Sequence, residues 1–372
     1  MASPRYVIVC GAGVMGAATA YYLARRGVHV TLVERTGVAC AASGKSGGFL
    51  ALDWCDGSVV GPLARLSFAL HAELAEELGA DYGYRRMDTY MLAAREQGRV
   101  AGGHRIPAAP AWIDGPAVVA QRLGSTETTA QVHPARFTAA LVDAARARGA
   151  ELRMGVVERV TAPDRGGPSV TVDGEAHPAD AVVLAMGPWT GRIDGVALPR
   201  IHGLKGYSVT LAAPDVPPHA LFMDYRLADG RALEPEIMPR PDGTVYVCGM
   251  ADLQPLPESA EGVEVSEAGC AVLAGAAGRV SAGLAAAPIA RRQACYRPVT
   301  DDGVPLIGRV LGAPGVYIAT GHGPWGMLNA PGTGLALAEL IVDGAARSLD
   351  LADFDPARLR SASRTPRGGP HA

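Results

Sequence analysis

The 372-residue sequence has no long apolar run, no basic block and almost no lysine. No stretch approaches the 18 apolar residues that a membrane-spanning helix needs, so we expect no transmembrane segment. The N-terminus runs straight into an apolar strand without a preceding basic region, so we expect no signal peptide. The net charge is −3, and without a basic block nucleic acid and anionic membranes are poor partners.

Cysteines are few and scattered through the chain. None forms a C-x-x-C pair, so the sequence indicates neither a metal site nor a disulfide framework. A chain of this kind fits a reducing cytoplasm. The six cysteines are Cys10, Cys40, Cys55, Cys248, Cys270 and Cys295.

Arginine supplies nearly all of the basic residues: 32 of the 34 are Arg. The two lysines, Lys45 and Lys205, both lie in Gly-rich segments. A compact ammonium at these two places suggests a chemical purpose, and chance is the alternative.

The length and the hydrophobic content of 48% indicate a large core divided between two intimately connected domains. No internal repeat is present. Tyr6–Cys10 is a β-branched run that predicts a buried strand. A helix is expected over Gly13–Arg26 and a second strand over Val28–Val33, with Glu34 at its end. These elements make a βαβ unit.

The segment between the first strand and the helix, G-A-G-V-M-G, has the spacing of a dinucleotide-binding fingerprint in the context that it requires. Gly11 allows a tight turn, Gly13 lets the backbone approach a pyrophosphate, and Gly16 lets helix and strand pack closely. The helix N-terminus offers free N–H groups to phosphate. Glu34 can accept hydrogen bonds from ribose hydroxyls and would repel the 2′-phosphate of NADP. The fingerprint by itself does not separate FAD from NAD.

The remaining elements follow from periodicity and turn signals. We expect helices over 68–78, 134–148, 264–280 and 331–342, the last beginning at Pro331. Strands are expected over 151–160, 169–172, 181–185, 289–298 and 315–319, with alternating strands from 205 to 251 that include 244–248. Residues 81–135 read as irregular.

Three further segments, taken together, are typical of one protein family. They are A-A-S-G-K-S-G-G at 41–48, V-L-A-M-G-P-W at 183–189 and G-H-G-P-W-G-M at 321–327. With the fingerprint, they make nearly the whole chain similar to the D-amino-acid-oxidase-like (DAO) superfamily of FAD-dependent oxidoreductases, which includes glycine oxidase, sarcosine oxidase and D-amino acid dehydrogenases. The matches around 46–54 and 321–331 look closest to a poorly characterised branch of oxidoreductases in fungi, plants and bacteria.

The resemblance implies FAD as the cofactor. The 41–48 segment would wrap the pyrophosphate and flavin, and the 321–327 loop would cover the flavin ring. The helix after this loop would stabilise the anionic reduced flavin. The cofactor contacts that the resemblance implies are Gly11, Gly13, Val14, Met15, Gly16, Glu34, Arg35, Ser43, Gly44, Lys45, Ser46, Gly47, Val157, Gly187, Trp189, Cys295, Gly321, His322, Gly323, Pro324, Trp325, Gly326 and Met327.

The implied fold is α/β: a Rossmann-type, glutathione-reductase-like FAD-binding domain with an interleaved α+β substrate domain built on an antiparallel sheet. We expect residues 1–80, 136–204 and 299–360 in the FAD-binding domain. Residues 81–135 and 205–298 would form the substrate domain, and 361–372 a disordered tail.

Residues 295–308, C-Y-R-P-V-T-D-D-G-V-P-L-I-G, resemble the family's G-x-R-P…D-G-x-P-x-I-G stretch. Arg297 matches the arginine that binds the substrate carboxylate, for which guanidinium geometry is suited; a structural ion pair is the alternative. Cys295 stands where sarcosine-oxidase-like members attach the flavin 8α carbon covalently. A small buried cysteine is the alternative reading.

Two departures bear on the substrate. Trp325 occupies the place of the carboxylate-binding lysine of the sarcosine oxidase branch, which argues against a plain sarcosine oxidase. Glu236 falls near a substrate-contacting tyrosine of glycine oxidase. A carboxylate there would favour a substrate with a second amine or another cationic group; a surface glutamate paired with Arg240 is the alternative.

The resemblance implies amine oxidation. The amine binds neutral, hydride moves to flavin N5, water hydrolyses the imine, and O2 is reduced to hydrogen peroxide, with no need for a general base such as His322. The expected catalytic set is Arg297, Lys45, Lys205, Glu236 and Trp325, the lysines assisting O2. Three alternatives remain: a dehydrogenase that reduces a quinone or a protein acceptor, a flavin-binding protein without turnover, and an NAD(P)-dependent dehydrogenase. The oligomeric state is open.

Overall fold

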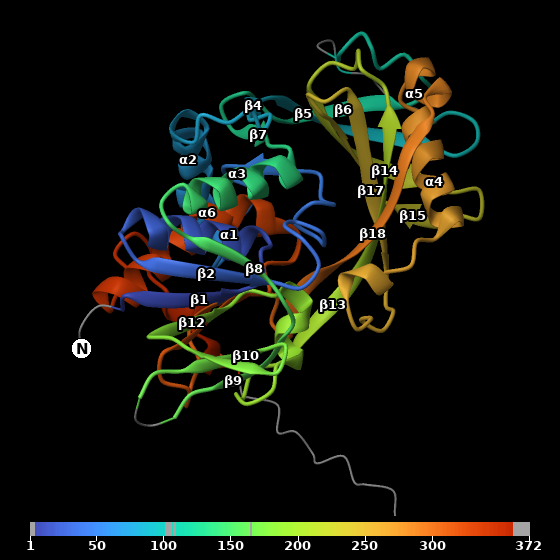
Figure 1. The fold of residues 1–372 in the computed structure, drawn as a ribbon. Coiled ribbons are helices and arrows are strands. Elements are labelled where there is room, and N and C mark those ends of the chain that lie inside the picture. The colour runs from blue at the N-terminus through green and yellow to red at the C-terminus, as the bar shows by residue number, and fades with distance from the viewer. Residues whose placement is uncertain (1–3, 101–105, 107–108, 164–165, 360–372) are drawn as a thin grey trace, which may run out of the picture.

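Two large β-sheets organise the computed structural model, which describes residues 4–100, 106, 109–163 and 166–359 (Figure 1). The expected tail at 361–372 lies outside these residues. The six-stranded sheet has the order β19-β20-β12-β1-β2-β8 and is parallel except for β19 at its edge. Its strands are β1 (Tyr6–Cys10), β2 (His29–Glu34), β8 (Glu151–Met154), β12 (Ala181–Leu184), β19 (Leu306–Arg309) and β20 (Val316–Thr320).

Both faces of this sheet are covered, which explains why its strands read as continuous apolar runs. Alternate residues of β1 enter different cores: Val7 and Val9 face the helices, and Ile8 and Cys10 face the opposite side. The helices are α1 (Val14–Arg25), α2 (Gly61–Glu77), α3 (Pro134–Arg146) and α6 (Gly326–Asp343). The opposite side carries a small sheet of β9 (Val157–Thr161), β10 (Ser169–Val172) and β11 (Glu175–Pro178) (Figure 1).

The eight-stranded sheet has the order β18-β13-β17-β16-β14-β5-β6, and β15 pairs with β14. It is antiparallel except for the parallel pair β14 and β5. Helices α4 (Glu267–Gly278) and α5 (Ala282–Ala286) cover its outer face (Figure 1). Its strands are β5 (Asp88–Arg95), β6 (Val118–Gly124), β13 (Ile201–Ala212), β14 (His219–Arg226), β15 (Ala232–Leu233), β16 (Glu236–Pro239), β17 (Thr244–Asp252) and β18 (Ile289–Thr300).

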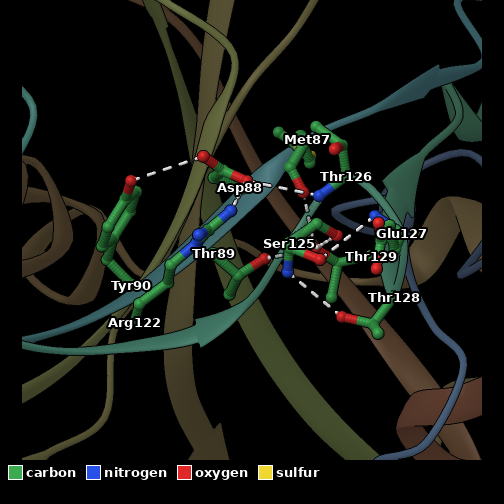
Figure 2. A network of polar contacts seen from close by, with 10 residues as sticks. All are labelled: Met87, Asp88, Thr89, Tyr90, Arg122, Ser125, Thr126, Glu127, Thr128 and Thr129. Atoms are coloured by element: carbon green, nitrogen blue, oxygen red, sulfur yellow. Dashed lines mark hydrogen bonds and ion pairs between the residues drawn. The ribbon is translucent and has the colours of Figure 1, made fainter. Parts of the chain in front are cut away.

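A polar junction ties β5 and β6 to a third, three-stranded sheet of β3 (Phe49–Ala51), β7 (Thr129–Gln131) and β4 (Arg85–Arg86) (Figure 2). Asp88 accepts hydrogen bonds from Arg122 at 2.6 Å and from the Thr126 backbone N–H at 3.2 Å. The Thr129 hydroxyl donates to the Met87 carbonyl at 2.6 Å and accepts from Thr89 at 2.9 Å. These contacts fix the connection between the two halves of the molecule.

The predicted Rossmann-type α/β fold is confirmed, and four local predictions are wrong, the fourth being the start of the last helix. Residues 81–135 contain β4 to β7: β4 pairs with β7 and β5 with β6 inside the segment, and β7 and β5 also pair with β3 and β14 outside it. The strand expected over 151–160 breaks at Gly155, where β8 leaves β2 and the chain turns to pair with β10. The second helix begins at Gly61 rather than at residue 68.

The last helix begins at Gly326, which places Pro331 inside it rather than at its start. A proline has no N–H, so the Met327 carbonyl lacks its usual helical donor. Helix α2 supplies a substitute: His71 Nε2 lies 3.0 Å from the Met327 carbonyl and 3.2 Å from the Leu328 carbonyl. The neighbouring Ser67 hydroxyl accepts the Gly332 N–H at 3.1 Å. These two α2 side chains therefore allow a proline in the helix interior.

Short 3₁₀ turns lie at Gly187–Arg192, Ala260–Gly262, Gly323–Trp325, Ala352–Phe354 and Pro356–Arg358. Among the described residues, no helix has the length and apolar character needed to span a bilayer. The same residues contain no group of three or more His, Cys, Asp or Glu that could hold a metal ion.

Candidate functional site

A cavity of about 560 Å³ is lined by elements of both large sheets. One end is formed by the fingerprint turn, the end of β2 and the loop after it. The other end is formed by β13, β16, β17 and β18. Its size and its mixture of apolar walls with a few charged groups are typical of a site for a cofactor and a small ligand.

The fingerprint turn can be built only from glycine at two positions. Gly11 has φ +102°, and a Cβ there would lie 2.6 Å from the Ala185 carbonyl oxygen. A Cβ on Gly16 would lie 1.9 Å from the Gly11 carbonyl oxygen. Gly16 does not line the cavity; it lets α1 pack against the turn, so that the N-terminus of α1 opens into the cavity.

Glu34 lies at the carboxyl end of β2 and lines the cavity beside Arg35. One carboxylate oxygen accepts the Ala12 N–H at 2.8 Å, and the other accepts the Thr36 N–H at 2.9 Å. These bonds hold the carboxylate in place. A carboxylate has room for further donors, so Glu34 can still accept a ribose hydroxyl.

Three side chains hold the backbone of the loop Ser43–Gly48 by hydrogen bonds. The Tyr246 hydroxyl donates to the Lys45 carbonyl at 2.9 Å, and Arg240 Nη2 donates to the Ser46 carbonyl at 2.6 Å. Gln131 Nε2 donates to the Gly47 carbonyl at 3.4 Å. Three successive carbonyls are thus held against the protein, while Ser43, Lys45 and Ser46 line the cavity. The loop can therefore present its opposite face to a cofactor.

Arg240 is buried, and burial lowers the pKa of its guanidinium. It lies over the Tyr246 ring, with its central carbon 4.8 Å from the ring centroid. A buried cation is costly unless it is bonded, and this one is held by a carbonyl and an aromatic face. Arg240 thus belongs to the support of the Ser43–Gly48 loop.

Three glycines face open space at the cavity wall. Gly187 and Gly323 have φ +56° and +55°, and a Cβ on either would meet no protein atom within 4 Å. A Cβ on Gly206, in β13, would meet the Met250 carbonyl oxygen at 3.7 Å. A wall without side chains is suited to the close approach of a flat ring. These features and the fingerprint fit FAD.

His322 lines the cavity and is buried. Burial lowers the pKa of its imidazole to about 3, so the ring is neutral near pH 7. Its Nε2 lies 3.0 Å from Thr333 Oγ1, while Nδ1 has no hydrogen-bond partner in the described part of the chain. His322 therefore offers one neutral hydrogen-bonding group toward a ligand.

Arg297 and Glu236 line the cavity from β18 and β16, at the end that the eight-stranded sheet forms. The Arg297 guanidinium makes no hydrogen bond or ion pair to another described residue, so no structural ion pair holds it. Glu236 accepts a hydrogen bond from Cys248 Sγ at 3.6 Å. Burial raises the pKa of Glu236, and the charge of Arg297 partly opposes the rise. The alternative partner, Arg240, is bonded to Ser46 instead.

Lys45 and Cys295 meet at the same wall. Lys45 Nζ donates to the Ala294 carbonyl at 3.3 Å, and both residues line the cavity. Burial raises the pKa of the Cys295 thiol, and the charges of Lys45 and Arg297 act in the opposite direction. The cysteine is thus a neutral thiol beside two cations.

The structure does not bring Lys205 or Trp325 to the cavity. Register places Lys205 opposite Tyr296, on the other face of the sheet, where its ammonium donates to Gln254 at 2.7 Å. Trp325 packs edge-on against Trp54, with ring centroids 6.3 Å apart. Three other expected contact residues also lie behind the wall: Gly44, Gly47 and Gly321.

Sequence reasoning missed the lining that β13 and β17 contribute. Tyr246 and Cys248 lie two residues apart on β17, and Ser208 is the cross-strand neighbour of Cys248 on β13. No short motif marks these positions. The available signal was the alternation of β17 after its Pro-Asp-Gly turn, which needs the neighbouring strands to show which face is the inner one.

Comparison with known proteins gives a consistent result. The profile of the family described as FAD dependent oxidoreductase (DAO) matches residues 6–340. A Schizosaccharomyces pombe protein whose name, oxidoreductase C1F5.03c, gives no substrate is 33% identical, covering 96% of this chain and 99% of its own. Glycine oxidase of Pseudomonas aeruginosa is 30% identical, covering 94% and 98%. The crystal structure of glycine oxidase from Geobacillus kaustophilus superposes with a TM-score of 0.76 at 25% identity, covering 97% of this chain and all of that one.

Proposed function

Because the chain belongs to the family of FAD-dependent oxidoreductases, we propose that it oxidises the C–N bond of an amino acid or an N-substituted amino acid. The observation that carries the proposal is one cavity that joins the dinucleotide fingerprint to Arg297, a cation with no bonding partner among the described residues. The similarity to proteins named glycine oxidase supports an amino acid as the substrate class.

FAD would be held along the whole cavity. The N-terminus of α1 faces its phosphates, and Glu34 accepts a ribose hydroxyl. Val157 lines the far end, where the adenine would lie. Bound FAD supplies the hydride acceptor of the reaction. The open wall at Gly187, Gly206 and Gly323 supports placement of the ring system there.

Arg297 would bind the substrate carboxylate through two parallel hydrogen bonds. This contact orients the α carbon and raises the local concentration of the reacting bond. The amine would react in its neutral form and lose two electrons and two protons to give an imine, which water hydrolyses. O2 would take up the electrons as hydrogen peroxide. Lys45, at the cavity wall, would stabilise negative charge as it develops on oxygen.

The purified yellow protein tests this proposal. A panel of amines and amino acids is mixed with it without oxygen, and the loss of flavin absorbance is recorded. Air is then admitted and peroxide is measured. We expect rapid reduction by one class of amino acid, peroxide in equal amount, and much weaker binding of that substrate by Arg297→Met.

Each contrary outcome has its own meaning. Reduction by substrate followed by slow reoxidation in air would assign a dehydrogenase that uses a quinone or a protein acceptor. A bound flavin that no amine reduces would overturn the proposed activity and indicate binding without turnover. A colourless protein that oxidises substrate with NAD would overturn the cofactor assignment.

Covalent attachment of FAD through Cys295 belongs to the same proposal. The thiol lines the cavity; burial raises its pKa, and the charge of Lys45 acts against that rise. Forming the bond to the 8α carbon would remove one hydrogen from the thiol and one from the flavin methyl group and would leave the flavin reduced by two electrons, which O2 would take up as hydrogen peroxide. Acid denaturation decides the question: yellow colour should stay with the polypeptide and move to the supernatant in Cys295→Ser. Colour in the supernatant of the unchanged protein would disprove the link.

We place the enzyme in a reducing compartment such as the cytoplasm, because all six cysteines are free. Unfolding the isolated protein in a thiol-alkylating reagent without reductant should label every cysteine that is not bonded to flavin. Unlabelled pairs joined by disulfides would contradict this assignment.

A further inference from the structure

Glu236 is a carboxyl group at the cavity wall that no neighbouring cation compensates. It lies on β16 between Phe222 of β14 and Cys248 of β17 in the register of the sheet. Neither neighbour is a cation. The Cys248 thiol is a weak donor, and its sulfur lies 3.6 Å from the carboxylate.

No cation among the described residues forms an ion pair with Glu236: of the other arginines that line the cavity, Arg35 pairs with Glu258 and Arg192 donates to the Pro257 carbonyl. Arg240 is bonded to the Ser46 carbonyl and stacked on Tyr246. Lys45 is bonded to the Ala294 carbonyl. Arg297 acts on Glu236 through its field but makes no ion pair with it, and β13 and β17 lie between their two strands. Glu236 is half-buried and burial raises its pKa, so the carboxylate form would be stabilised by a cation that the ligand brings.

We propose that Glu236, with Cys248 beside it, is a subsite for a cationic group at the end of the substrate that is distant from the carboxylate. This inference rests on the proposed function, since it takes Arg297 as the anchor of the substrate carboxylate. The substrate class is an amino acid with a second basic nitrogen, an ammonium or a guanidinium, in addition to the amine that is oxidised.

The separation of the two charges limits the shape of the ligand. Arg297 and Glu236 lie on strands that are not neighbours, yet both side chains line one cavity. A ligand that meets both therefore carries its carboxylate and its cation at opposite ends of a chain. Binding should depend sharply on the number of methylenes between them.

Matched ligands that differ only in charge test the subsite. A guanidino carboxylate and the ureido carboxylate of the same length have nearly the same shape, and the first is a cation while the second is neutral. Dissociation constants of both series, with two to five methylenes, are measured on the FAD-loaded protein by titration calorimetry. We expect the guanidino acid to bind at least tenfold more tightly than its partner at one length, as a buried charge-assisted hydrogen bond allows.

Variants locate the effect. Glu236→Gln should reduce the preference to within about twofold, and Glu236→Asp should restore it for a ligand one methylene longer. Glu234→Gln removes an exposed carboxylate from the same cavity and should keep the preference. Flavin absorbance per chain confirms that each variant is folded and loaded.

Two results overturn the subsite: equal binding of charged and neutral partners at every length, or an undiminished preference in Glu236→Gln. Failure of the proposed function has a different signature. If Arg297→Met leaves the binding of both series unchanged, the carboxylate anchor is wrong, whatever Glu236 does.

Discussion

The proline inside α6 leads to a prediction about stability and cofactor binding together. Pro331 leaves the Met327 carbonyl without a helical donor, and His71 replaces that donor from 256 residues away. The substitution His71→Leu fills the space of the imidazole with an apolar side chain of moderate size but removes the N–H donor. A buried carbonyl that loses its donor costs about 1–3 kcal/mol, so the free energy of unfolding should fall by that amount.

Urea unfolding followed by circular dichroism measures the change. Glu76→Ala, at an exposed position on the same helix, is the control and should stay within about 0.5 kcal/mol of the parent. His71→Gln keeps a donor and should lose less than His71→Leu. The first turn of α6 lines the cavity, so the dissociation constant of FAD should also rise in His71→Leu and not in the control. A His71→Leu protein as stable as the control would refute the reasoning, because the Met327 carbonyl would then not depend on His71.

Three other perturbations have definite expected outcomes. Arg240→Met removes the donor to the Ser46 carbonyl and should weaken FAD binding at least tenfold in equilibrium dialysis with little change in helix content; unchanged affinity would contradict its supporting role. Gly206→Leu should fold normally but exclude the flavin, since its side chain meets little protein and fills the cavity; a yellow variant with full flavin content would contradict this. The pKa values of His71 and His322 are lowered in the folded state, to about 4 and about 3, so unfolded chains bind more protons below pH 6.5. Stability should therefore be full above pH 6.5 and fall as the pH decreases toward 4, by less in His71→Gln, and equal pH dependence in the two proteins would contradict the assignment.

The sequence predicts a structural feature well when the residues that determine the feature lie close together in the chain. The fingerprint glycines and Glu34 were predictable, because their roles follow from backbone geometry within one βαβ unit. The start of α6 was not predictable, because the hydrogen-bond donor that makes up for the missing N–H of Pro331 comes from another helix. Strands β5 and β6 were hidden in a Gly- and Pro-rich segment, and β5 finds its partner β14 more than a hundred residues later.

The same reasoning explains the outcome for the cavity residues. Arg297 and Cys295 lie two positions apart on β18 and therefore share a face, as their motif implied. Lys205 was predicted as a site residue because lysine is rare in this chain. The strand register determines which face of the sheet its side chain occupies. Lys205 pairs with Tyr296 on the face away from the cavity. Tyr246 could not be recognised, because its role is a hydrogen bond to a loop 201 residues earlier in the chain.

The support of the Ser43–Gly48 loop has a consequence for the time at which the enzyme matures. During synthesis the βαβ unit emerges first, while the ribosome is still making the second half of the chain. The loop, however, takes its hydrogen bonds from Arg240 and Tyr246, which lie 194 and 201 residues after the carbonyls that they hold. A nascent chain would thus contain the complete nucleotide fingerprint long before the Ser43–Gly48 loop could be held in place to orient the flavin. Loading of the cofactor belongs to the finished polypeptide, and a chain released before β17 would have the sequence motif without the site.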